Sequence, residues 1–105
     1  MTDEILTHTA PLTRWAGERG TYHVLIVTGK EAEAIAMHER IHRLEYGSRR
    51  GFGSVKIYAK IGTTRWKTSV FPSKDGSWFL LINAKVRKAQ DLAVDEAAQV
   101  ELELL

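Results

Sequence analysis

The chain has 105 residues, of which 27% are charged and 44% hydrophobic, a composition typical of one soluble folded domain. It contains no cysteine, which excludes disulfides, a thiolate nucleophile and zinc sites built on sulfur, and which fits a reducing compartment. No apolar run approaches the roughly 20 residues of a membrane helix, and the acidic start does not resemble a secretory signal. We therefore expect residues 1–105 to form a single cytoplasmic domain without membrane association.

The net charge of +2 conceals an uneven distribution along the chain. Residues 40–88 carry twelve lysines and arginines and two acids, a net charge of +10. The flanking segments are acidic, with −3 over residues 1–39 and −5 over residues 89–105. A basic middle between acidic ends predicts either an anion-attracting face or charges that neutralise each other in the fold.

Two strands are predicted before the first helix. Residues 5–15 are rich in threonine, and Pro11 restricts them to a sheet edge or a bulge. Glycines at 17 and 20 interrupt the chain, and residues 22–27 form a β-branched run typical of a buried strand.

The next segment, about residues 29–46, is predicted to be a helix. Thr28 and Glu31 have the spacing of a capping box at its start, and Gly47 is a typical residue for its end. One apolar stripe, which we expect to face the core, recurs every three or four residues and consists of Ala34, Met37, Ile41 and Leu44.

Period-2 alternation dominates the second half. Residues 55–61 and 65–70 predict a hairpin whose even-length turn at 62–63 keeps both apolar sets on one face. A strand over 78–82, a short helix over about 84–90 capped by Asn83, and a last strand over 100–104 complete the chain. The fold class predicted is a β-dominated α+β fold, a small barrel of about six strands with one longer and one short helix.

A zinc-protease pattern occurs within the predicted helix. His38-Glu39-Arg40-Ile41-His42 reads H-E-x-x-H, in which two imidazoles one turn apart can share a zinc ion and the glutamate can activate its water. No residue at the usual offsets supplies a third ligand. We weigh a zinc-dependent hydrolase and surface metal binding against a chance occurrence, and we expect no metal site.

The polar face of the predicted hairpin combines cations with one aromatic ring. Such a face can follow a phosphate backbone and stack a base, although Glu101 and Glu103 could neutralise it. Neutralising about four phosphates would give a log–log salt slope near −3 to −4. The candidate anion or nucleic-acid contact residues are Arg49, Arg50, Lys56, Tyr58, Lys60, Arg65 and Lys67. By contrast, Trp66 and Trp78 are expected in the core.

Three ordered blocks resemble the family known as domain of unknown function 1905. They are Gly51-Phe52-Gly53-Ser54-Val55, the segment from Ile61-Gly62 to Trp66-Lys67-Thr68-Ser69-Val70-Phe71-Pro72, and Ala84-Lys85-Val86-Arg87-Lys88-Ala89. The match is strongest over residues 49–104 and extends more weakly to the N-terminal half. The resemblance implies a double-split β-barrel, distantly like regulators and antitoxins of the AbrB and MazE type.

The chain departs from the family pattern at three places. Leu81 stands where the family usually has proline, Asn83 where it often has lysine, and Asp95-Glu96 where it usually has Gly-Asp. The last change removes a glycine that takes positive φ without cost, so we expect the turn before the final strand to differ. The resemblance implies no reaction, so no catalytic residue is carried over.

These observations predict a non-catalytic binding or interaction module without a cofactor. Nucleic-acid binding, as in the regulators with a similar barrel, is the first alternative, and the zinc hydrolase is the second. A protein partner or a second copy remains open, with the final strand as the candidate pairing edge.

Overall fold

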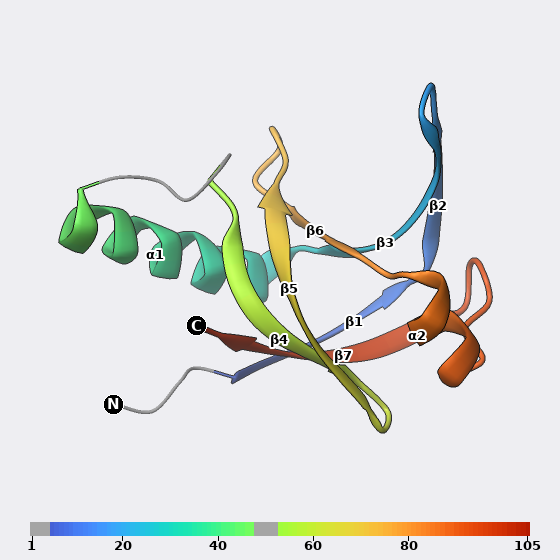
Figure 1. Cartoon of the computed structure of the whole chain (residues 1–105). Helices are drawn as coiled ribbons and strands as arrows, with labels where there is room; N and C mark the ends of the chain where they lie inside the picture. The colour runs from blue at the N-terminus through green and yellow to red at the C-terminus, as the bar shows by residue number, and fades with distance from the viewer. Residues whose placement is uncertain (1–4, 48–52) are drawn as a thin grey trace.

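The computed structural model describes residues 5–47 and 53–105, which hold seven strands and two helices (Figure 1). The strands form one curled antiparallel sheet in the order β1-β7-β4-β5-β6-β3-β2. They are β1 Ile5–Pro11, β2 Thr13–Gly17, β3 Gly20–Val27, β4 Val55–Ile61, β5 Thr64–Pro72, β6 Trp78–Leu81 and β7 Ala97–Leu104. The helices are α1 Gly29–Tyr46 and α2 Ala84–Ala89. The β-dominated fold class is thus confirmed, with the sheet curled into a half-barrel.

The strand count is seven rather than about six, because residues 5–15 divide at Leu12. Leu12 donates from its backbone nitrogen to the Glu96 carbonyl at 2.9 Å, and its carbonyl accepts from the Asp95 nitrogen at 2.8 Å. These bonds turn the backbone, and the side chain of Leu12 is fully buried. The two strands on either side of this bend, β1 and β2, form the opposite edges of the sheet.

The final strand lies inside the sheet, which corrects the expectation that it offers an edge for a second copy. β7 pairs with β1 along one side and with β4 along the other. Over residues 101–103 both rows of backbone hydrogen-bonding groups therefore face neighbouring strands, so this part of β7 has no free edge for another chain.

The core fills the inner side of the curled sheet as the alternation predicts. Ile57 pairs with Thr68 and Ala59 pairs with Trp66 across the hairpin, whose turn has two residues. The predicted hairpin register is thus confirmed. Trp78 is buried and Trp66 is half-buried against the core, as expected for both. α1 contributes its own buried residues, Ala32 and Ile35.

The helix α1 has the predicted bounds, but the prediction of its inward face was wrong. Ile35 is fully buried, whereas Met37, Ile41 and Leu44 are 51%, 48% and 77% exposed. At about 100° per residue, the stripe lies on nearly the opposite side of the helix from Ile35. Small side chains at 32 and 36 allow that side to approach the sheet closely, and the C-terminal half of α1 extends past the strands (Figure 1).

Local signals at the helix ends and turns are mostly confirmed. The Asn83 Oδ1 accepts from the Val86 nitrogen at 2.9 Å, and Gly47 ends α1 with φ 74°. The capping box is wrong: Thr28 is the N-cap residue but makes no side-chain cap bond, and Glu31 instead contacts His8 Nδ1 at 2.8 Å. Asp95 takes φ 72°, the left-handed conformation that glycine adopts more easily.

Candidate functional site

The predicted basic face exists on the outer side of the β4–β5 hairpin. Tyr58 pairs with Lys67 and Lys60 pairs with Arg65, so these side chains share the face opposite the core. Lys56 alternates along β4 with Tyr58 and Lys60, so it lies on the same outer face. Arg49 and Arg50 lie outside the described residues.

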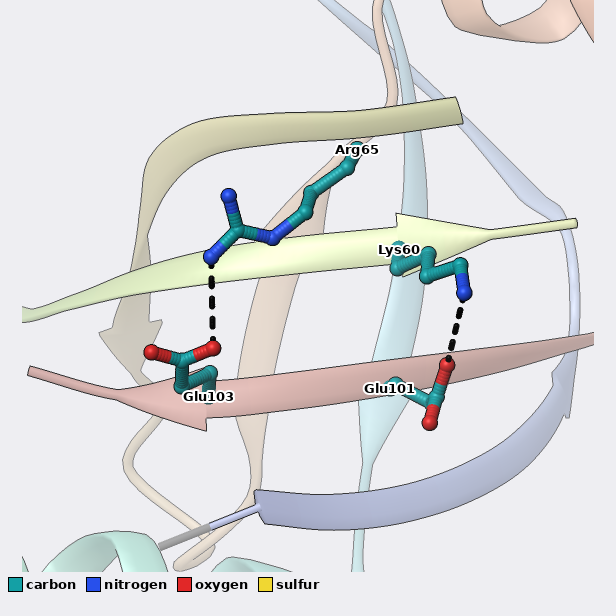
Figure 2. Close-up of polar contacts among 4 residues, drawn as sticks. All are labelled: Lys60, Arg65, Glu101 and Glu103. Atoms are coloured by element: carbon teal, nitrogen blue, oxygen red, sulfur yellow. Dashed lines mark hydrogen bonds and ion pairs between the residues drawn. The ribbon is translucent and has the colours of Figure 1, made fainter. Parts of the chain in front are cut away.

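Two of its four described cations are neutralised by β7. Lys60 Nζ lies 3.8 Å from Glu101 Oε2, and Arg65 Nη2 donates to Glu103 Oε1 at 3.2 Å (Figure 2). The four side chains are exposed or half-buried, so each pair stabilises the fold by at most about 1 kcal/mol. The more important effect is electrostatic, because the carboxylates cancel the positive field at this end of the hairpin.

Tyr58 is also engaged within the face. The Arg65 guanidinium carbon lies 3.8 Å from the centroid of the Tyr58 ring, a cation–π contact. One face of the ring is therefore covered, and Tyr58 offers a base less stacking surface than its place in the sequence suggests.

The other two cations have no such partner. Within the described part of the chain, Lys56 and Lys67 have no carboxylate within 4 Å. Lys56 pairs with Ser69, two residues before Phe71 on the same side of β5. The uncompensated charge is thus displaced from the hairpin turn toward the open end of the hairpin.

An aromatic cluster that the sequence analysis missed continues this outer face. Phe71 stacks on Phe79 with ring centroids 5.5 Å apart, and Trp15 meets Phe79 edge-on at 5.2 Å. We call Trp15, Phe71 and Phe79 the aromatic cluster. Trp15 is 38% exposed. Alternation through Lys67, Ser69 and Phe71 indicates one member, but the contact with Trp15 depends on a strand order that no local signal reveals.

The H-E-x-x-H residues are held in separate contacts. His38 Nε2 lies 2.9 Å from the Leu105 carbonyl oxygen, and the His42 ring packs on Tyr46 with centroids 4.6 Å apart. Glu39 Oε2 lies 3.9 Å from Nη2 of Arg43, which is one turn further along α1. Among residues 5–47 and 53–105, no group of three metal-ligating side chains is close enough to hold an ion.

A second histidine site was also missed, because it joins residues 64 positions apart. His23 on β3 contacts Arg87 on α2, with 2.8 Å between His23 Nδ1 and Arg87 Nη1. A guanidinium can only donate, so Nδ1 accepts. Partial burial, then the charges of Arg87 and Arg14, lower the pKa of His23 below its usual 6.5.

This lowered pKa makes stability depend on His23 at acidic pH. Because the unfolded chain binds the proton more readily, the contribution is complete above about pH 6.5 and is lost as the pH falls toward the folded-state pKa. We expect the urea midpoint to fall between about pH 7.5 and about pH 5 by more in the wild type than in His23→Gln. An equal decrease of the urea midpoint in the two proteins would contradict the assignment of this pH dependence to His23.

The fold and the surfaces define a small β-rich domain with a basic hairpin face and an exposed aromatic cluster. The chain belongs to the family described as a domain of unknown function, DUF1905, whose model matches residues 8–102. No curated protein matches the chain. Neither helix, in the part of the chain that the structure describes, is long and apolar enough to cross a membrane.

Proposed function

We propose that this domain is a cytoplasmic binding module without a reaction of its own, and that its ligand is single-stranded nucleic acid. The observation that carries the proposal is the position of Lys56 and Lys67, two cations that no carboxylate of the described residues compensates, on the same outer face as the aromatic cluster. Sequence-tolerant binding of a single strand needs two elements: cations that follow the phosphate backbone, and aromatic rings on which the bases stack.

The geometry revises the expected salt dependence. With Lys60 and Arg65 neutralised by Glu101 and Glu103, about two phosphates rather than four are contacted by free cations. For a single strand this corresponds to a log–log salt slope of about −1.4. Fluorescence anisotropy of a labelled oligothymidine of about 12 nucleotides measures both the affinity and the slope.

Charge reversal on the outer face tests the contact directly. Lys56→Glu/Lys67→Glu should weaken binding at low salt at least about tenfold and bring the slope near zero, because both phosphate contacts are lost. The matched control is Lys30→Glu/Lys88→Glu, the same charge change on two exposed helical lysines, and it should retain most of the affinity. Trp15→Ala should weaken binding by the roughly 1–3 kcal/mol of one stacked base.

The neutralising glutamates provide the opposite test. Glu101→Gln/Glu103→Gln releases Lys60 and Arg65, so the salt slope should steepen toward about −3. No binding at low salt, or equal losses in the two lysine double variants, would refute the proposal. The absence of a reaction is tested by metal analysis of protein purified without chelator: stoichiometric zinc that is lost on His42→Ala would contradict it.

A further inference from the structure

A pocket of about 300 Å³ lies where β3 extends beyond the end of β6. The register pairs Val24 with Leu81, the last residue of β6, and the chain then leaves the sheet for α2. The His23 carbonyl accepts from the Ile82 nitrogen at 2.8 Å. The backbone groups of Thr21 point to the same side, because ladder bonds alternate along a strand, but β6 ends before it reaches Thr21. His23 and Arg87 line the pocket together with Thr21, Tyr22 and Asn83.

Arg87 lies in this pocket with neutral partners only. Its Nη1 contacts His23 Nδ1 at 2.8 Å and the Ile82 carbonyl oxygen at 3.1 Å. Within residues 5–47 and 53–105, no carboxylate lies within 4 Å of Arg87, and its Nε and Nη2 make no hydrogen bond. A half-buried guanidinium that is fixed in orientation but not compensated in charge is suited to bind an anion.

The surroundings of Arg87 favour the same kind of ligand. No acidic residue of the described segments lines the pocket, and Arg14, the register neighbour of His23 on β2, adds a second positive charge nearby. Because His23 Nδ1 accepts from Arg87, a neutral His23 ring carries its proton on Nε2 and is a further donor. The hydroxyl group of Thr21, which lies on the same face of β3 as His23, adds a further donor.

We propose that this pocket is an oxyanion site, in which Arg87 binds the phosphate or carboxylate group of a small ligand and His23 holds the guanidinium in place. Trp15 pairs with Tyr22, and paired residues point to the same face of the sheet. Because Tyr22 and His23 are consecutive on β3, His23 points to the face opposite Trp15. The site is therefore separate from the nucleic-acid surface proposed above.

The test uses ¹⁵N-labelled protein titrated by NMR at constant ionic strength, with sodium phosphate in one arm and sodium acetate in the other. We expect saturable shifts at Thr21, His23 and the Arg87 side chain with a millimolar dissociation constant. Arg87→Gln should raise that constant at least about tenfold, and Arg87→Lys should restore part of the affinity. Lys85→Gln removes an exposed charge from the same helix and should leave the affinity unchanged.

The two arms identify the source of the oxyanion. Saturation with phosphate alone, with acetate alone or with both supports the site and assigns its preferred group. Shifts that fail to saturate with either salt, or saturation that persists unchanged in an Arg87→Gln protein with native amide dispersion, would overturn it. Because oligonucleotide binding is measured separately, either proposal can fail without the other.

Discussion

Replacing Ile35 with alanine is expected to lower the free energy of unfolding by about 2–5 kcal/mol, whereas Leu44→Ala should change it by less than about 0.5 kcal/mol. Ile35 is fully buried on the core-facing side of α1, so its truncation leaves a cavity among residues that cannot fully collapse into it. Leu44 is 77% exposed, so its truncation removes almost no packing.

Urea unfolding followed by tryptophan fluorescence measures both changes. The two variants make the same kind of truncation on one helix, and each introduces the best helix former, so helix propensity does not account for a difference between them. A loss at Leu44 as large as that at Ile35 would mean that the apolar stripe, and not Ile35, faces the core.

A loss of about 2–5 kcal/mol is likewise expected for Leu12→Ala. The Leu12 side chain is fully buried at the bend between β1 and β2, and its backbone holds the turn at Asp95 and Glu96. Truncation therefore creates a cavity at the point where the two edge strands meet.

The control for Leu12 is Thr9→Ala on β1, an exposed strand residue whose replacement should cost less than about 1 kcal/mol. Urea midpoints and hydrogen exchange of the Glu96 region together report the effect. If Leu12→Ala unfolds at the wild-type urea concentration, the bend contributes nothing to the stability of the sheet.

The elements whose structure is determined by residues close together in the sequence could be predicted. The bounds of α1, the cap at Asn83 and the two-residue turn of the β4–β5 hairpin all follow from signals a few residues long. Alternation likewise assigns Lys56 and Lys67 to the outer face. Such features are set by backbone geometry and period, which a single segment carries within itself.

The inward face of α1 could not be predicted, because periodicity finds an apolar stripe without showing what packs on it. The face that contains Ile35 with Ala32 and Ala36 is less apolar than the stripe of larger side chains, yet it is the one that contacts the core. Close approach to a curled sheet favours small side chains, and this preference is visible only once the helix is placed.

The candidate sites depend still more on strand order. Whether Glu101 and Glu103 neutralise the hairpin is decided by the β4–β7 register, which pairs Lys60 with Glu101. The aromatic cluster joins β2, near the start of the chain, to β5 and β6, and the oxyanion pocket joins β3 to α2. These juxtapositions arise from long-range pairing, for which the sequence has no local signal.

The pairing of β1 with β7 has a consequence for how the chain folds during synthesis. Ile5 pairs with Glu103, so this ladder closes a loop of nearly the whole described chain, and the entropy of closure delays such contacts. We expect the β4–β5 hairpin to form early and β1 to remain without its sheet partner until residues 97–104 have left the ribosome. Until then the edge of β4 is also uncovered, and a nascent chain exposes two strand edges that can pair with other chains.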